Sequence, residues 1–203
     1  MKNSLIFDLD GTLWDSTKQI KIVWNNIAQK YNINLSEFTI ESIMGLNNAE
    51  IISKIFNNDI SLGNSFLDEC QKSENEFLAI HGGNIYPNTI HTIQELSKKY
   101  NLYIVSNCQK GYIETFLEFY NLNHYFKDFE CSGNTDLPKA SNIKLLMKRN
   151  SIDNSIYIGD TEKDYDAAIN SNNRFIWASY GFGDCKNYDY CINDIKELLD
   201  ILK

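Results

Sequence analysis

The sequence predicts an α/β protein in which helices cover both faces of a parallel sheet, with an all-helical segment inserted after the first strand. From about residue 86 onward, short apolar runs that end in polar residues alternate with segments of helical spacing, as in a parallel sheet with crossover helices. Between about residues 15 and 80 only helical spacing is found. A chain of 203 residues is long enough for one domain with a smaller insertion.

The first predicted strand is the apolar run Leu5–Phe7, which leads into two carboxylates and a glycine. Because side chains alternate along a strand, we expect Asp8 and Asp10 to point to the same side, with Leu9 pointing away. Two neighbouring carboxylates repel each other unless a cation, a shared proton or hydrogen bonds offset the repulsion. Carboxylate oxygens favour Mg²⁺. Taken alone, the stretch equally fits a strand that ends in an Asp-Gly turn.

The segment after this strand shows three amphipathic helical patterns, which begin at Ile20, Ile51 and Phe66. It contains no convincing strand. We therefore expect residues 15–82 to form an inserted helical domain, with residues 1–14 and 83–203 forming the α/β domain. The expected hinges lie near residues 15–16 and 81–83.

The remainder of the chain alternates between strand and helix patterns. Apolar runs predict strands at residues 102–105, 126–131, 156–158 and 175–177, and helical spacing separates them. A last helical pattern runs from Ile195 to Leu202, where Asp194 and Glu197 have the spacing of a capping box.

Polar residues stand at the ends of three of the predicted strands. Asp8 and Asp10 follow the first, Ser106 and Asn107 follow the second, and Asp160 follows a later one. In an open parallel sheet the ligand site lies beyond the carboxyl ends of the strands, near the point where the strand order reverses. We therefore expect these side chains to meet in one site.

Composition limits the classes of partner. The net charge is −8 and the isoelectric point about 4.9, which argues against nucleic acid or an anionic membrane as the main partner. A small anionic substrate stays possible because a metal can supply local positive charge. Five scattered cysteines without a CxxC pair indicate free thiols in a reducing cytoplasm. No stretch fits a signal peptide or a membrane helix. The oligomeric state, monomer or dimer, is left open.

Four motifs in order resemble those of the haloacid dehalogenase (HAD) superfamily: residues 8–12 (DLDGT), Ser106-Asn107, Lys139, and residues 159–164 (GDTEKD). The resemblance implies a Rossmann-like, HAD-like core, and it implies that the helical insertion is the superfamily's cap domain. The segment Tyr157–Gly183 is most similar to phosphoglycolate phosphatase-like members.

The resemblance implies a division of roles at the site. Asp8 would be the nucleophile that forms an aspartyl-phosphate, and Asp10 would be the general acid and then the general base. Mg²⁺ would be held by Asp8, the backbone carbonyl of Asp10, and Asp160. Lys139 would pair with Asp8 and the phosphate, and Asp164 would brace Lys139 or the metal's waters.

Three further residues are expected to bind substrate: Thr12, Ser106 and Asn107. Thr12 and Asn107 equally fit ordinary turn residues. The third motif departs from the common Lys-Pro pattern because Pro138 precedes Lys139, so Lys144 is kept as the alternative lysine. Asp166 is interpreted as a surface acid.

The expected function is Mg²⁺-dependent hydrolysis of a small phosphorylated metabolite, with phosphoglycolate as the best single guess. The alternatives are a sugar phosphomutase like β-phosphoglucomutase, a pyrophosphatase, or a phosphate- or metal-binding module without turnover. Specificity would lie in the cap, where the stretch Ser42–Asn47 resembles the superfamily's substrate-specificity loop but equally fits a helix-to-helix turn at Gly45.

Overall fold

The sheet at the centre of the molecule has six parallel strands in the order β5-β4-β1-β6-β7-β8. The computed structural model describes residues 3–35 and 39–202. Because β1 lies between β4 and β6, the carboxyl ends of these three strands meet at one edge of the sheet. The strands are β1 (Ser4–Phe7), β4 (Asn101–Ser106), β5 (Phe126–Cys131), β6 (Ser155–Gly159), β7 (Arg174–Ala178) and β8 (Tyr190–Ile192).

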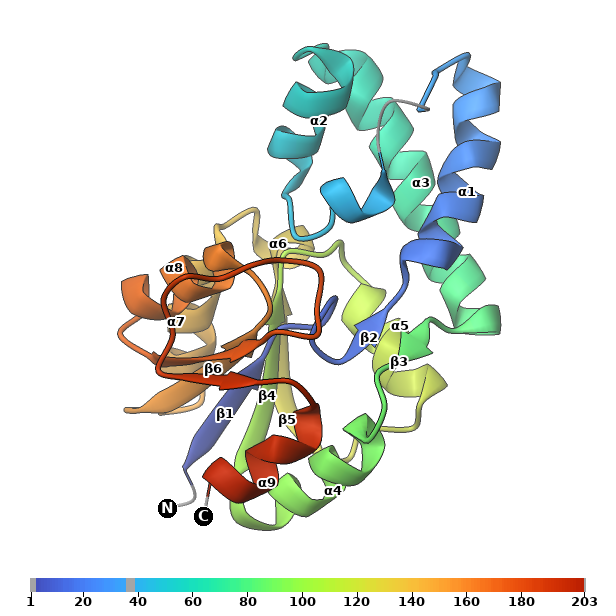
Figure 1. Cartoon of the computed structure of the whole chain (residues 1–203). Helices are drawn as coiled ribbons and strands as arrows, with labels where there is room; N and C mark the ends of the chain where they lie inside the picture. The colour runs from blue at the N-terminus through green and yellow to red at the C-terminus, as the bar shows by residue number, and fades with distance from the viewer. Residues whose placement is uncertain (1–2, 36–38, 203) are drawn as a thin grey trace.

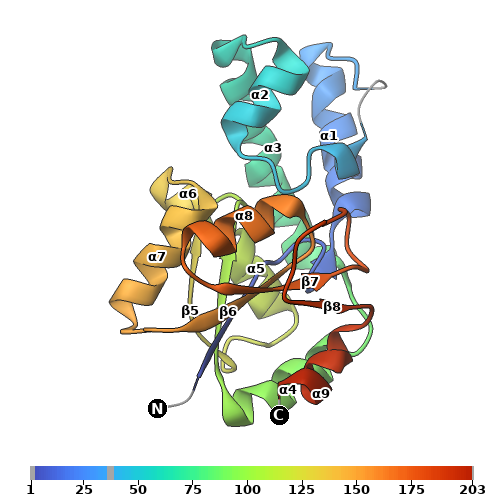
Figure 2. The same ribbon diagram turned by 60° about the vertical axis from the view of Figure 1, so that its left-hand side comes forward.

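Helices cover both faces of this sheet, so the predicted α/β class is confirmed (Figures 1 and 2). Side chains alternate along β1: Leu5 and Phe7 pack on one face, and Ile6 packs on the other. The first face is covered by α4 (Thr89–Lys99), α5 (Tyr112–Phe119) and α9 (Leu198–Ile201). The second is covered by α7 (Lys139–Arg149) and α8 (Glu162–Asn170), with the short α6 (Ser132–Thr135) before α7.

The inserted segment is helical and has an apolar core of its own, formed by a separate cluster that includes Trp24, Ile52 and Phe66. It lies over the carboxyl ends of the strands (Figure 1). Its elements are α1 (Thr17–Tyr31), a 3₁₀ turn (Ile40–Ser42), α2 (Asn48–Phe56) and α3 (Ile60–His81).

Two short antiparallel strands join this segment to the core: β2 (Trp14–Asp15) and β3 (Asn84–Ile85). Strand β2 overlaps the first expected hinge, near residues 15–16, and β3 directly follows the second, near residues 81–83. The division into residues 15–82 and the remainder stays a prediction, and residues 1, 2, 36–38 and 203 of those ranges lie outside the described residues. Within the described ranges, no helix is long and apolar enough to span a membrane.

The C-terminal region differs from expectation. A sixth strand, β8, precedes the closing helix, which consists of a 3₁₀ turn (Ile195–Glu197) followed by the single turn of α9. The expected capping box is wrong: the Asp194 carboxylate accepts a hydrogen bond from Lys196 N at 2.9 Å, and Glu197 accepts one from Asn193 N. Spacing alone does not distinguish a capping box from the tighter 3₁₀ arrangement.

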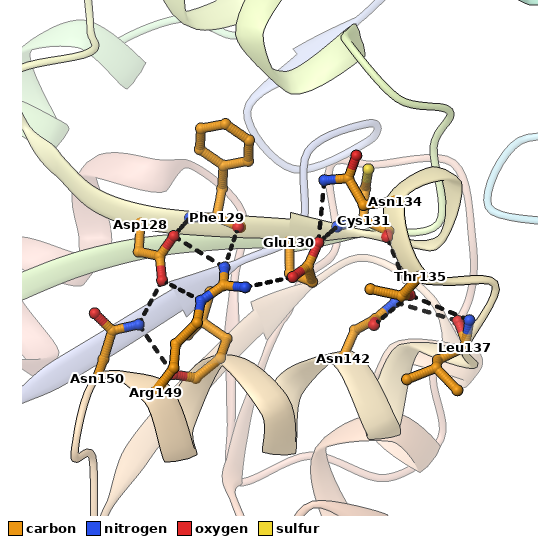
Figure 3. Close-up of polar contacts among 11 residues, drawn as sticks. Asp128, Phe129, Glu130, Cys131, Asn134, Thr135, Leu137, Asn142, Arg149 and Asn150 are labelled. Atoms are coloured by element: carbon orange, nitrogen blue, oxygen red, sulfur yellow. Dashed lines mark hydrogen bonds and ion pairs between the residues drawn. The ribbon is translucent and has the colours of Figure 1, made fainter.

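Helix α7 is anchored at both ends, which fixes the position of its first residue, Lys139 (Figure 3). Near its C-terminus, Arg149 forms ion pairs with Asp128 and Glu130 of β5. Near its N-terminus, Asn142 Nδ2 donates to Leu137 O at 3.2 Å, and Asn142 Oδ1 accepts from Thr135. Pro138 is the N-cap residue of α7, so a proline before the lysine is compatible with a helix that begins at Lys139.

Candidate active site

Asp8 lies directly after β1, at the centre of the sheet. Its backbone N–H donates to Ile158 O at 2.8 Å and so extends the pairing with β6 by one residue. The residue is 3% exposed. Asp8 Oδ2 lies 3.0 Å from Lys139 Nζ, whereas Oδ1 has no hydrogen-bond partner. Burial raises the pKa of Asp8 to about 6, although Lys139 acts to lower it.

Asp10 faces different partners. Its Oδ1 accepts hydrogen bonds from Tyr112 Oη at 2.8 Å and from Ser16 Oγ at 3.0 Å. Burial raises the pKa of Asp10 to about 7; the hydrogen bond from Tyr112 opposes this shift, and the negative charge of Asp8 adds to it. A carboxyl group with such a pKa can both donate and accept a proton near neutral pH.

Asp8 and Asp10 line the same cavity, whereas Leu9 packs in the apolar core, in agreement with alternation along the strand. The partners of the two carboxylates differ. Asp8 contacts α7 on one face of the sheet, and Asp10 contacts α5 on the other. This separation gives each carboxylate its own hydrogen-bonding environment.

Lys139 is 6% exposed and forms ion pairs with two carboxylates, Asp8 at 3.0 Å and Asp164 at 2.6 Å. Burial by itself would lower the pKa of Lys139, but the two carboxylates raise it above its ordinary value. The lysine therefore stays charged. The alternative, Lys144, is exposed on α7, and Asp166 is exposed as expected for a surface acid.

Asp164 holds Lys139 in place from the first turn of α8. Its Oδ1 accepts from Lys139, and its Oδ2 accepts from Thr161 N at 3.1 Å and Thr161 Oγ1 at 2.7 Å. Thr161 and Asp164 form a capping box, which fixes the carboxylate relative to the helix start. Both oxygens are thus engaged by protein donors, consistent with the expected bracing of Lys139.

Asp160 is buried after β6, in a space that two glycines leave open. A Cβ added to Gly11, which has a φ of +78°, would lie 2.1 Å from Asp160 Oδ2, and one added to Gly181 would lie 2.3 Å from Asp160 Cβ. Phe182 N donates to Asp160 Oδ2 at 2.7 Å. Burial, followed by the charges of Asp164 and Asp8, raises the pKa of Asp160 well above its ordinary value.

The acidic cluster fits a divalent cation. Ligand atoms of Asp8, Asp160 and Asp164 lie within 4.8 Å of one another, and Lys139 is the cation that pairs with this cluster among the described residues. Since Asp164 is already engaged on both oxygens, Asp8 and Asp160 are the carboxylates with capacity for a metal. Within this cluster, Asp8 Oδ1 is buried and has no hydrogen-bond partner, so it is free to bind a cation. All-oxygen donor sets suit Mg²⁺.

Of the three expected substrate-binding residues, two reach the cavity beside Asp8 and one does not. Ser106 ends β4 and is buried at the cavity, and Asn107 follows it. Asn107 Nδ2 donates to Gly45 O at 3.0 Å, which links the core to the loop of the inserted segment. Thr12 is fully buried, its hydroxyl has no partner, and it is not among the residues that line this cavity.

The cavity measures about 70 Å³ and is enclosed from the other side by the helical segment. Met44, Gly45 and Leu46 line it, in agreement with the interpretation of this stretch as a specificity loop. The lining residues that the sequence does not indicate include Glu74 on α3 and Gln109, which donates to Glu74 at 2.6 Å. A glutamate within an amphipathic helix is normally a surface residue, so the sequence pattern does not indicate that Glu74 is buried at the site.

The comparisons with known proteins agree with this geometry. A family model described as haloacid dehalogenase-like hydrolase matches residues 5–178. A phosphoglycolate phosphatase from Vibrio parahaemolyticus is 23% identical to this chain, over 98% of this chain and 95% of its own length. Pyrophosphatase PpaX from Oceanobacillus iheyensis is 22% identical, over 98% and 96%. A haloacid dehalogenase-like family hydrolase from Streptococcus pneumoniae has the same fold, with a TM-score of 0.87 and 22% identity over 100% of this chain and 99% of that one.

The family match spans most of the chain, from the first strand to β7. It includes the four ordered motifs and the helical insertion, and it confirms the expected hydrolase class. The chain belongs to the haloacid dehalogenase-like hydrolase family.

Proposed function

We propose that this hydrolase cleaves small phosphomonoesters with the help of Mg²⁺, through a phosphoryl intermediate on Asp8. The observation that carries the proposal is the asymmetry of the Asp8 carboxylate. One oxygen is held by Lys139 at 3.0 Å, and the other is buried without a hydrogen-bond partner beside a cavity. A nucleophile needs such a fixed and unengaged oxygen.

In the first step, a carboxylate oxygen of Asp8 forms a bond to phosphorus as the ester P–O bond breaks. Asp10 gives its proton to the departing alkoxide, so the alcohol leaves neutral. The hydrogen bonds from Ser16 and Tyr112 hold the Asp10 carboxyl group in place for this transfer. The second step reverses the proton's direction: Asp10 takes a proton from water, whose oxygen attacks phosphorus and releases inorganic phosphate and free Asp8.

Charge neutralisation is shared between the protein and the cation. When bound, Mg²⁺ supplies positive charge that offsets repulsion between Asp8 and the phosphoryl oxygens. Asp8, Asp160 and the backbone carbonyl of Asp10 would hold it. Lys139 adds a fixed positive charge, since Asp164 keeps it oriented at 2.6 Å. Ser106, buried at the cavity, would donate to a phosphoryl oxygen.

The names of the relatives support two candidate substrates. Phosphoglycolate, the expectation from the sequence, is in the name of the Vibrio parahaemolyticus relative, and pyrophosphate is implied by the name of the Oceanobacillus iheyensis relative. Both are small phosphorylated anions. The sugar phosphomutase and the module without turnover stay as alternatives.

The five free cysteines support a reducing compartment such as the cytoplasm.

The test is hydrolysis of p-nitrophenyl phosphate with Mg²⁺ and with excess EDTA. We expect turnover with Mg²⁺ only, and we expect Asp8→Asn to abolish it while leaving the thermal unfolding curve cooperative. Asp166→Asn is the matched control because Asp166 is an exposed acid, so its activity should stay at the wild-type level. A wild-type rate in Asp8→Asn, or no turnover in the wild type, would refute the proposal.

A further inference from the structure

The cavity above Asp8 and Asp10 is small and lies between the core and the helical segment. Its volume of about 70 Å³ corresponds to on the order of five water positions, since one water needs roughly 10–15 Å³ of such space. It is bounded by the core on one side and by α1, α2 and α3 on the other. In the arrangement described, it can take a phosphoryl group together with a short alcohol.

The ionisable side chains that line this cavity are all acids. Among the described residues, its ionisable lining consists of the carboxylates Asp8, Asp10 and Glu74, together with the weak acids Cys108 and Tyr112; no lysine, arginine or histidine lines it. Lys139 lies below the cavity, engaged by Asp8 and Asp164. Two carboxylates are accounted for by the proposed mechanism, whereas Glu74 is not.

The lysines of the helical segment do not compensate for Glu74. Lys54 bonds to the backbone carbonyl of Ser42, and Lys30 pairs with Glu69. Lys18 and Lys21 line a separate cavity, and Lys72 is exposed on α3 and does not line the cavity above Asp8. An anionic group beside Glu74 would therefore find no cationic side chain in the lining.

The Glu74 carboxyl group is held in a fixed position inside the site. The residue is 4% exposed on α3. Its Oε1 accepts from Trp24 Nε1 in the helical segment, and its Oε2 accepts from Gln109 Nε2 in the core at 2.6 Å. Both donors are neutral, and no described cationic residue pairs with it. Such a carboxylate favours a neighbouring hydroxyl or ammonium group and repels an anion.

We propose that Glu74 is a specificity-determining residue that restricts the enzyme to short phosphomonoesters whose leaving alcohol carries no negative charge. This inference rests on the proposed phosphatase function and narrows it. A carboxylate on the leaving alcohol, as in phosphoglycolate, would enter a cavity whose fixed charges are all acidic. A hydroxyl or amine in the same place would meet the acceptor oxygens of Glu74 and the polar groups of Gln71 and Asn48.

The test compares three substrates of nearly equal size: 2-hydroxyethyl phosphate, O-phosphoethanolamine and 2-phosphoglycolate. Each is assayed by phosphate release with Mg²⁺, alongside p-nitrophenyl phosphate. We expect kcat/KM for at least one of the first two to exceed that for phosphoglycolate by about tenfold or more, as for like charges held close together inside a protein. A preference for phosphoglycolate, or turnover of p-nitrophenyl phosphate with none of the three, overturns the inference alone. No turnover of any of the four overturns the proposed phosphatase function itself.

The variant Glu74→Gln removes the charge and keeps an amide of the same shape. We expect the ratio of kcat/KM for phosphoglycolate to that for 2-hydroxyethyl phosphate to rise about tenfold or more. Glu76→Gln is the matched control, since Glu76 is exposed on the same helix, and its ratio should stay at the wild-type value. Because the ratio compares two substrates on one sample, partial misfolding does not affect it. An unchanged ratio in Glu74→Gln overturns the inference.

Discussion

Replacing Lys139 by methionine tests the buried charge network beneath the site. The Lys139 side chain is 6% exposed, and its two partners, Asp8 and Asp164, are 5% and 0% exposed. Methionine keeps the length of the side chain but leaves both carboxylates without their cation. Removing one member of such a buried pair costs about 3–5 kcal/mol of unfolding free energy. For a chain of this size, that corresponds to a fall of about 10 °C in Tm.

The measurement is thermal and urea unfolding in EDTA, with Lys144→Met as the control. Lys144 is exposed on the same helix, so its replacement should change the unfolding free energy by less than about 0.5 kcal/mol. The double variant Lys139→Met/Asp164→Asn should be more stable than the sum of the single effects predicts, by about 0.5–3 kcal/mol. Equal stability of the Lys139→Met and Lys144→Met variants would refute the reasoning.

Three further predictions follow from the site. Mg²⁺ should raise the Tm of the wild type but not of Asp160→Asn, as measured by titration; an equal rise in both would remove Asp160 from the ligand set. Asp10→Asn should lower kcat/KM, which reports the transfer to Asp8, by about 10²–10⁴-fold for alkyl esters and far less for aryl esters, whose leaving groups need no proton; an equal loss in kcat/KM contradicts the acid role. Burial raises the pKa of Glu74 above its ordinary 4.5, so the folded state binds the extra proton and stability falls as pH rises through this range. Glu74→Gln should therefore gain stability relative to wild type as the pH rises above 4.5 in urea titrations, and a difference independent of pH would contradict this.

The sequence predicts the fold because the signals are local. Short apolar runs and helical spacing locate the parallel strands and most helices, and the ends of β1, β4 and β6 bring Asp8, Ser106 and Asp160 to one edge. Strand β8 has only three residues and a mixed pattern, so periodicity gives little indication of it.

The hydrogen-bond partners of the site are not predictable in the same way. The helical spacing places Tyr112 on the apolar face of a helix, yet its hydroxyl donates to Asp10 at 2.8 Å, although the two residues are 102 positions apart in the sequence. Glu74 reads as a solvated acid, yet the packing of the helical segment on the core buries it. Both contacts arise between segments far apart in sequence, where spacing within one element carries no information.

The partners of Asp8 and Asp10 are a related case. Alternation along the strand agrees with both carboxylates lining one cavity and Leu9 packing in the core. Asp8 contacts Lys139 of α7 and Asp10 contacts Tyr112 of α5, and both contacts join segments far apart in sequence. A sequence pattern therefore locates both acids but does not give the partners of each.

The most direct test of the proposed mechanism is to trap the phosphoryl group on Asp8. Asp10→Asn slows the attack of water, because the base is missing, while p-nitrophenyl phosphate still transfers its phosphoryl group without an acid. The variant is mixed with this substrate and Mg²⁺, quenched in acid, digested and examined by mass spectrometry. We predict one added phosphoryl group on the peptide that contains Asp8. A phosphoryl group on another residue, or turnover with no labelled peptide, would contradict the mechanism.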